Sequence, residues 1–327
     1  MKPDKPFKTY DEQIQILKSR NVIIPDDEQA IEFLSTFSYY SFINGYKDLF
    51  PMDNDKFIVP VVIYDFYFLS FLDRYLNNIF FKYIIRVEKE LKTHISYRIS
   101  EKYGVTTDLH TPINYAPDDY LSKQHFKNTW STNNTIKKIK HDVLKSKNQS
   151  IVHYKNNHNH IPCWILVNGI SLGVTIELYN ILLADDKTYV CEHMIKSDKL
   201  TIEEKKEFFN KGIKILRKYR NNIAHGNRTF NNSIKEELPK KQVLLLSGGN
   251  ITNADYVNGI GKNDIFAVIL TICSILDKNT KQIFFSEIRL AFSMMSNVTF
   301  STGQNIFGIL SLPNDFISKL DSIINFE

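Results

Sequence analysis

Residues 217–228, RKYRNNIAHGNR, bring together side chains that could carry out acid–base and phosphate chemistry. Arg220 falls in the apolar series of a predicted helix, at helical spacing after Leu216 and before Ile223. A charge in that position needs a partner, because an unpaired buried guanidinium is very costly. His225 follows five residues later, about 140° further around an ideal helix, an angle that a long arginine side chain can bridge. We therefore expect Arg220 and His225 to face one cleft at the end of this helix.

Arginine, histidine and amide side chains without a carboxylate cluster suit the cleavage of an RNA phosphodiester. The ribose 2′-hydroxyl is the nucleophile in that reaction, so the protein supplies only a proton shuttle and positive charge for the phosphorane. Histidine suits the shuttle and arginine donates bidentately to phosphate, which assigns these roles to His225 and Arg220. Asn221 adds a neutral donor, and neither a metal nor a cofactor is required. The alternative is structural, an arginine paired with a core carboxylate and a histidine that caps the helix, since short R-x4-H matches are frequent by accident.

Two blocks of positive charge stand out in a chain whose net charge is only +5. Residues 121–160 contain eight lysines and five histidines against one acid, Asp142. Residues 205–228 contain eight lysines or arginines against Glu207 alone. Such blocks indicate an anionic partner, usually nucleic acid, although lysine-rich helices can also be solvated faces. The basic residues predicted to bind RNA are Arg86, Lys92, Lys137, Lys138, Lys140, Lys145, Arg217, Lys218 and Arg228.

The composition predicts a mainly α protein. Hydrophobic residues make up 43% of the 327 residues, enough for one large core or two modest ones, and glycine and proline are sparse for an all-β fold with many tight turns. The three widely spaced cysteines lie in or beside apolar runs, so we expect reduced core residues and no disulfide framework. The first residues contain no apolar stretch, so no signal peptide is expected, and no apolar run reaches the roughly 20 residues of a membrane span. A cytoplasmic protein is expected.

The hydrophobic pattern also predicts the helices that must position Arg220 and His225. A small N-terminal helical module is expected over residues 1–55 and a larger helical domain over residues 56–327. Residues 57–103 should form one long helix, or two nearly collinear ones, ending at Gly104. Residues 239–262 are expected to form a loop that could hold a short hairpin. The other predicted helices cover residues 10–20, 25–37, 38–50, 162–183 (with a close contact at a glycine), 201–225, 264–277 and 281–296.

Several segments resemble known families in the same order along the chain. RKYRNNIAHGNR resembles the R-x4-6-H signature of HEPN ribonucleases, with Arg220 and His225 as the pair. It also resembles the RN-x-x-AH stretch of the Abi (abortive infection, Abi-D/Abi-F-like) family of bacterial phage-defence proteins. Residues 5–46 are similar to that family's N-terminus. Two further helices of the family, R-x-E and P-x-W…G, are matched through Arg86, Glu88, Pro162, Trp164 and Gly173. The resemblance covers at least residues 5–230.

The resemblance implies a HEPN-like helical bundle, related to the RNA-guided RNases of type VI CRISPR systems. It implies a site completed by dimerisation, and an association with abortive infection and with small structured RNAs encoded nearby. The chain departs from the family at two positions. Lys92 stands where the R-x-E-x-x-x-R pattern ends in arginine, and Asn168 stands where an acid often follows the tryptophan. Both departures leave the completeness of the site open.

Glu88 has two interpretations. As a site residue, its carboxylate orients Arg220 or His225. As an ordinary helix residue, it pairs only with Arg86 or Lys92 on a solvated face.

A zinc site is a weaker interpretation of HYKNNHNHIPC. The spacing of its histidines and cysteine fits no standard finger, so a basic loop that contacts RNA phosphates is preferred and no metal is expected. The residues concerned are His153, His158, His160 and Cys163.

The leading hypothesis is a metal-independent HEPN endoribonuclease that acts as a homodimer in a phage-defence or toxin role. A cognate RNA lying on the two basic blocks would restrain it. Two alternatives remain open. One is a non-catalytic RNA-binding protein that uses the same surface to bind phosphate. The other is a structural interaction protein, in which the R-x4-H pair forms a buried network at a helix end.

Overall fold

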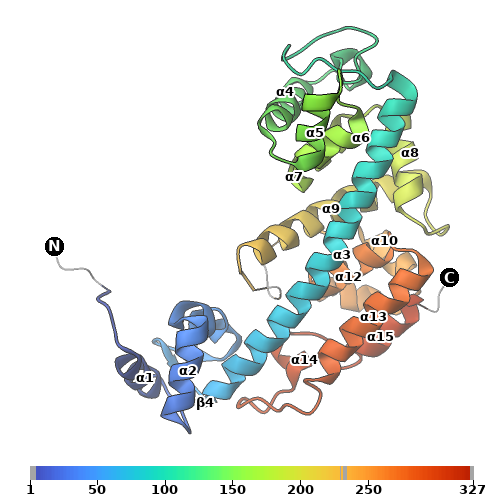
Figure 1. Ribbon diagram of the computed structural model, residues 1–327. Coiled ribbons are helices and arrows are strands. Elements are labelled where there is room, and N and C mark those ends of the chain that lie inside the picture. Colours follow the sequence, from blue (N-terminus) through green and yellow to red (C-terminus); the bar gives the residue numbers. More distant parts are fainter. Residues whose placement is uncertain (1–4, 229, 231–233, 325–327) are drawn as a thin grey trace. The chain divides into compact units, whose positions relative to one another are not determined.

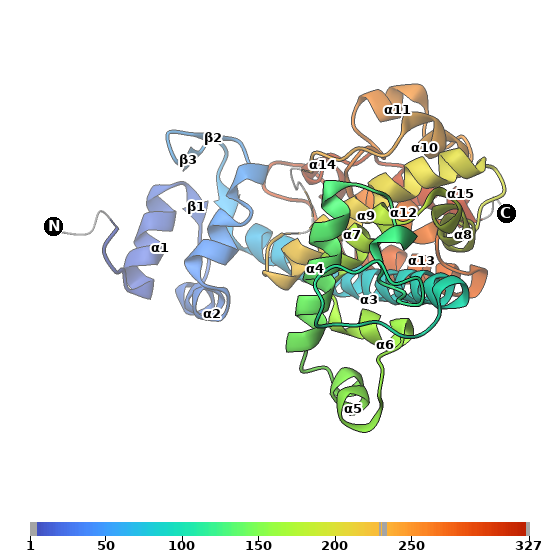
Figure 2. The same ribbon diagram turned by 90° about the horizontal axis from the view of Figure 1, so that it is seen from above.

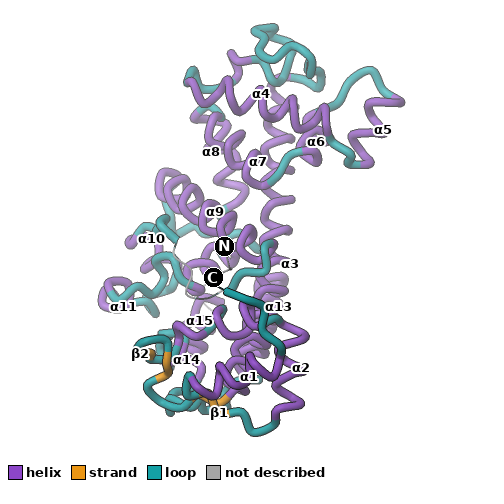
Figure 3. The backbone as a smooth tube through the Cα atoms, turned by 90° about the vertical axis from the view of Figure 1, so that its left-hand side faces the viewer, coloured by secondary structure: helices purple, strands orange, loops and turns teal. Residues whose placement is uncertain are grey.

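Helices make up nearly all of the regular structure in the described part of the chain (Figures 1 and 3). The computed structural model describes residues 5–228, 230 and 234–324. Within that part, the strands are two-residue pieces that pair as β1 with β4 in parallel and β2 with β3 antiparallel. Their bounds are Val22–Ile23 (β1), Met52–Asp53 (β2), Lys56–Phe57 (β3) and Val61–Val62 (β4). The prediction of a mainly α protein is confirmed.

The chain forms two compact units. Unit 1 comprises Met1–Phe81, Asn222–Ser233 and Gln282–Asn325, and unit 2 comprises Lys82–Asn221, Ile234–Lys281 and Phe326–Glu327. Three helices contribute residues to both units, namely α3 (Ile63–Tyr103), α9 (Ile202–Ala224) and α13 (Lys278–Ser293). Residues 1–55 all belong to unit 1, and their status as a separate module stays a prediction.

Two capped helices open unit 1 and confirm the predicted segments. Thr9 forms a capping box at the start of α1 (Tyr10–Ser19), in which its hydroxyl and the Glu12 carboxylate each accept a hydrogen bond from the other residue's amide. Asp26 caps α2 (Asp27–Phe37) by accepting two backbone N–H bonds. Figure 2 shows both helices close to the short strands of this unit.

The third predicted N-terminal helix is not regular. Residues Tyr40–Asn44 form a π-turn, because the Gly45 N–H bonds back to the Tyr40 carbonyl at 3.1 Å, and Lys47–Leu49 form a 3-10 turn. The remaining elements of unit 1 are the part of α13 from Gln282, α14 (Ile306–Ile309) and α15 (Phe316–Ile324).

Aromatic rings fill the core of unit 1. Phe66 of α3 is fully buried, and its ring centroid lies 5.4 Å from Phe50 and 6.2 Å from Phe42. Phe80 of α3 lies 6.5 Å from Phe284 of α13. Phe66 and Phe80 of the long helix therefore belong to this aromatic core.

The long helix α3 matches its prediction closely. It runs without a break for 41 residues and ends one residue before Gly104, whose φ of +84° is the left-handed conformation that terminates helices. The rest of unit 2 is helical as well. Its elements are the 3-10 turn Lys123–His125, α4 (Trp130–Lys145), α5 (Gln149–Asn157), α6 (Cys163–Leu166), the 3-10 turn Val167–Gly169, α7 (Leu172–Ile181), α8 (Ala184–Met194), α10 (Lys240–Leu246), α11 (Asn253–Val257) and α12 (Ile265–Cys273).

Two predictions of secondary structure in unit 2 are wrong. The single helix expected over residues 162–183 is broken, because Ser171 takes an extended conformation and its hydroxyl caps a new helix, α7. Residues 239–262 contain two short helices, where a loop with a hairpin was expected. Pro239 precedes the first, and Thr252 and Asp255 form a capping box at the second.

Candidate functional site

Helix α9 carries most of the predicted site. Thr201 and Glu204 cap its start reciprocally, with Thr201 N–H to Glu204 Oε2 at 2.9 Å and Glu204 N–H to Thr201 Oγ1 at 3.4 Å. The chain leaves the helix through Gly226, whose φ is +68°. One face of the helix is buried through Phe208, Phe209, Gly212, Ile213, Ile215, Leu216 and Tyr219. The opposite face is left to the basic residues.

Arg220 is half-buried in unit 2, as its place in the apolar series predicts. Its Nε–H is inaccessible to solvent and has no hydrogen-bond partner within the described residues. No carboxylate of the described part forms an ion pair with this guanidinium either. A buried donor without an acceptor is costly, so Arg220 is suited to receive an anion that is not part of the described chain.

His225 belongs to unit 1 and is exposed. Its backbone N–H bonds to the Asn222 carbonyl at 3.2 Å in the turn that ends α9. Its imidazole makes no hydrogen bond to the part of the chain that the structure describes. The ring is therefore accessible to a substrate and has no described group that fixes its orientation.

A polar pocket of unit 1 lies beside the turn that contains His225. It measures about 350 Å³, and the residues flanking the histidine, Ile223 and Gly226, are part of its wall. The Tyr46 hydroxyl donates to the buried Asp73 carboxylate at 3.0 Å inside this wall, and burial together with that carboxylate raises the pKa of Tyr46. The other residues of the wall are Phe37, Ser41, Phe42, Ser70, Arg74, Asn77 and Asn78. The only sequence signal was a polar DR…NN pattern inside an aromatic helix.

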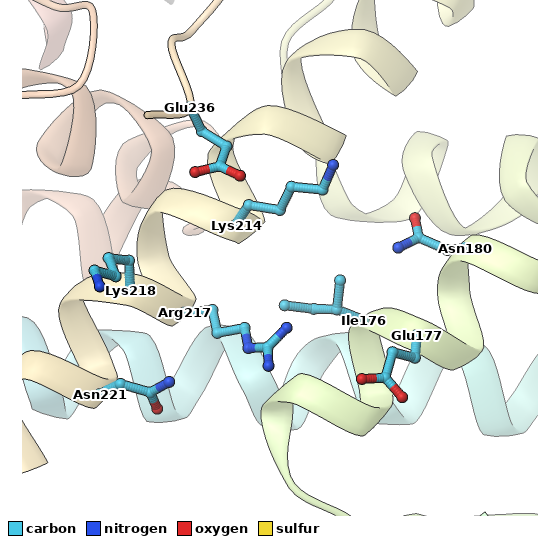
Figure 4. A pocket seen from close by; sticks show the side chains of 8 residues that line it. All are labelled: Ile176, Glu177, Asn180, Lys214, Arg217, Lys218, Asn221 and Glu236. Carbon is cyan, nitrogen blue, oxygen red and sulfur yellow. The ribbon is translucent and has the colours of Figure 1, made fainter. Parts of the chain in front are cut away.

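A second, basic pocket lies in unit 2 between α7 and α9 (Figure 4). Its volume is about 360 Å³. Its wall consists of Ile176, Glu177 and Asn180 from α7, Lys214, Arg217, Lys218 and Asn221 from α9, and Glu236. Three residues predicted to belong to the site, Arg217, Lys218 and Asn221, are thus brought together, while Lys214 and Asn180 are additions that helix periodicity alone did not single out.

Arg217 lies directly against Gly173. A Cβ atom on that glycine would come within 3.0 Å of the guanidinium carbon. The close contact predicted at a glycine of this segment is therefore confirmed, and Arg217 is its partner. Glu177, one of the two carboxylates of the pocket wall, accepts hydrogen bonds from Lys138 at 3.0 and 3.1 Å. Within the described residues the Arg217 guanidinium has no hydrogen bond or ion pair.

Glu88 pairs with Lys92. The Lys92 ammonium donates to Glu88 Oε1 at 2.7 Å and to the Ile170 carbonyl at 2.7 Å. The residue is 8% exposed, so this pair does not lie on a solvated face. The other carboxylate oxygen, Oε2, is buried and has no partner in the described part of the chain. The structure brings Glu88 into no bond with Arg220 among the described residues.

Two predicted RNA-binding arginines are engaged by protein carboxylates. Arg86 donates to Asp277 at 2.7 Å. Arg228 donates to both oxygens of Asp48 at 2.6 and 2.8 Å and to a backbone carbonyl at 2.8 Å. These bonds would have to be exchanged before either side chain could hold a phosphate.

The four lysines predicted on α4 have different environments. Lys137 and Lys145 are exposed and have no partner among the described residues, whereas Lys138 is held by Glu177. Lys140 is 2% exposed, donates to the Thr111 carbonyl at 2.9 Å, and has its pKa lowered by burial. Only the first two therefore present free charge to solvent.

Lys187 is a basic residue that sequence reasoning did not single out. Its ammonium donates at 2.7 Å to the backbone carbonyl of Asn180, a residue that lines the basic pocket. Burial and the nearby ammonium of Lys127 lower the pKa of Lys187 to about 7. An anion bound near this ammonium would raise its pKa again.

The cysteines are free and buried, as predicted. Burial raises the pKa of Cys163, and that of Cys191 to about 11, so neither is a reactive thiolate. In the described ranges, no group of three or more histidine, cysteine, aspartate or glutamate side chains is arranged to hold a metal ion. None of the described helices combines the length and apolar character that crossing a membrane requires.

The comparisons identify the family. A family model described as Abi-like protein matches residues 32–231, a range that contains the whole of α9. The chain belongs to the Abi-like protein family, and this membership supports a role in abortive infection, that is, in defence against phage. No curated protein and no solved structure matches the chain.

Proposed function

We propose that the protein is a HEPN-type endoribonuclease that cleaves RNA by attack of the ribose 2′-hydroxyl. The observation that carries the proposal is Arg220, whose buried Nε–H has no acceptor among the described residues, five residues before the exposed His225. A phosphate oxygen is the acceptor that a guanidinium binds best. Family membership supports the same direction, since the chain is Abi-like.

In the proposed reaction the substrate supplies its own nucleophile. His225 accepts the 2′-hydroxyl proton or returns a proton to the departing 5′-oxygen, and Arg220 stabilises the charge that develops on the phosphorane. The P–O5′ bond breaks as the P–O2′ bond forms. The products are a 2′,3′-cyclic phosphate and a 5′-hydroxyl. Asn221 and Glu88 remain proposed positioning residues.

Control of the nuclease is the second part of the proposal. An active RNase is harmful to its own cell, so we assign the restraint to a cognate RNA on the basic blocks and the complete site to a homodimer. Exposed lysines such as Lys137 and Lys145 support an RNA surface, because no described carboxylate neutralises them.

Arg220→Ala separates the enzyme from a structural role for this residue. The enzyme hypothesis expects the variant to lose RNA cleavage, yet to unfold in urea at the same concentration as wild type or a higher one, because an unsatisfied buried donor is removed. Arg220→Lys is the matched control, since it keeps the charge but loses the planar fork. A variant that no longer folds would instead support the structural interpretation. A variant that folds and still cleaves would refute the role of Arg220.

A further inference from the structure

The central cation of the basic pocket of unit 2 is positioned by packing against a neighbouring helix and not by an ion pair. Arg217 of α9 extends toward Ile176 and Glu177 of α7, as Figure 4 shows. Its guanidinium rests on Gly173, where a Cβ atom would approach to 3.0 Å. No described carboxylate binds it. The protein thus fixes the position of this guanidinium while leaving its donors available.

The other residues of the pocket favour a phosphate group over a simple carboxylate counter-ion. Lys214 and Lys218 add two further cations, and Asn180 and Asn221 add amides that can bond hydroxyl groups or base edges. Of the two acids, Glu177 is already neutralised by Lys138. The volume of about 360 Å³ lies at the lower end of small-molecule sites, which are about 300–1,000 Å³. That space holds a phosphate and part of its nucleoside.

The spacing along α9 relates this pocket to the proposed cleavage site. Arg217 precedes Arg220 by three residues, and side chains three apart are neighbours on a helix. Asn221, which lines the pocket, follows Arg220 directly. A strand whose phosphate is bound by Arg220 therefore has its next phosphate within the range of Arg217.

Resting on the proposed function, we propose that this pocket binds the RNA phosphate adjacent to the scissile one. Arg217 holds it bidentately, Lys214 and Lys218 supply further charge, and Asn180 and Asn221 bind the attached nucleoside. Gly173 is a positioning residue that leaves room for the guanidinium.

The test uses an RNA that cannot be cleaved. A ten-nucleotide strand with 2′-O-methyl groups throughout is made with one neutral methylphosphonate linkage at each position in turn, and its affinity for the protein is measured by fluorescence anisotropy. Wild type should lose affinity most at the two linkages bound by Arg220 and Arg217. Arg217→Ala should bind the unmodified strand roughly ten- to hundredfold more weakly than wild type, the range for hydrogen bonds to charged groups. Its affinity should no longer depend on one of the two sensitive linkages and should still depend on the other.

Matched variants complete the experiment. Lys211→Ala removes a charge from the same helix outside the pocket wall, and should keep sensitivity to both linkages. Gly173→Ala displaces the guanidinium by only a few tenths of an ångström, so it should fold and weaken binding at the same linkage as Arg217→Ala. A linkage pattern that is the same in wild type and Arg217→Ala, or no binding by wild type, would overturn the inference. The nuclease proposal is judged separately, by cleavage of ordinary RNA.

Discussion

At the scale of single residues, the basic and acidic side chains divide into those bound by the protein and those left open. Glu88, Arg86 and Arg228 each have a described partner, whereas Arg217 and Arg220 have none among the described residues. Two guanidinium groups without a described partner on one helix favour the binding of an anion, because structural arginines are usually paired with carboxylates. Periodicity predicted the half-burial of Arg220 and the need for a partner, and Glu88 was one of two interpretations of what that partner is.

The buried Glu88–Lys92 pair should contribute to the stability of the fold. Lys92→Met leaves a buried carboxylate without its cation and should lower the free energy of unfolding by about 3–5 kcal/mol. The double variant Glu88→Gln/Lys92→Met should recover most of that loss, because the buried charge is gone. Urea denaturation of wild type, both single variants and the double variant measures the coupling. Strictly additive losses would show that the two side chains do not interact.

Asp264 should make stability depend on pH. Burial raises the pKa of this carboxyl to about 6, above the ordinary 3.8, although it accepts N–H bonds from Gly261 and Ala267. The folded state therefore binds the proton more tightly, so the stabilisation is complete below the ordinary pKa and is lost as the pH rises through 6. Asp264→Asn keeps an acceptor and removes the titration. Between pH 4 and 7, wild type should lose about 2 kcal/mol relative to this variant. Parallel stability curves would contradict the assignment.

At the scale of elements, the ends of α9 determine where its side chains are presented. Gly226 has a φ of +68° and open space around the position of a Cβ atom. Gly226→Ala should therefore destabilise the protein by about 1 kcal/mol through backbone strain alone. Gly226→Asn, which tolerates this conformation better, should lose less. Equal thermal denaturation midpoints for all three proteins would mean that the turn adapts to any residue.

The sequence was most informative where one local rule acts alone. The long apolar spacing of α3 and its stop at Gly104 required no tertiary knowledge. The prediction of one helix over residues 162–183 is wrong, because Ser171 caps a new helix although the apolar pattern is continuous. For the candidate site as well, some features could be predicted from the sequence and others could not. The residues of α9 followed from the motif, but the contact of Arg217 with Gly173 joins two helices and could not be read from spacing.

At the scale of the whole molecule, the distribution of charge matters more than its total. A net charge of +5 is modest for a nucleic-acid-binding protein, so affinity must come from local groups of free cations. Among the described residues, such groups include the exposed lysines of α4 and the unpaired cations of α9.

The salt dependence of RNA binding tests this distribution. For a single strand, the slope of log K against log salt is about −0.7 for each phosphate contact. Lys137→Ala/Lys145→Ala should reduce the magnitude of that slope by about 1.4. Lys8→Ala/Lys18→Ala removes the same charge from exposed lysines that are paired with carboxylates outside the blocks, and should leave the slope unchanged. The same reduction for both pairs would mean that only total charge matters.

The most direct measurement compares wild type with His225→Ala on mixed RNA in excess EDTA, after bound RNA has been removed. The new ends are then characterised chemically. Wild type alone should produce fragments with 2′,3′-cyclic phosphate and 5′-hydroxyl ends, while His225→Ala should bind RNA with unchanged affinity and leave it intact. RNA that stays intact with wild type, although it is tightly bound, would contradict the nuclease. It would leave an Abi-like protein that binds RNA without cleaving it.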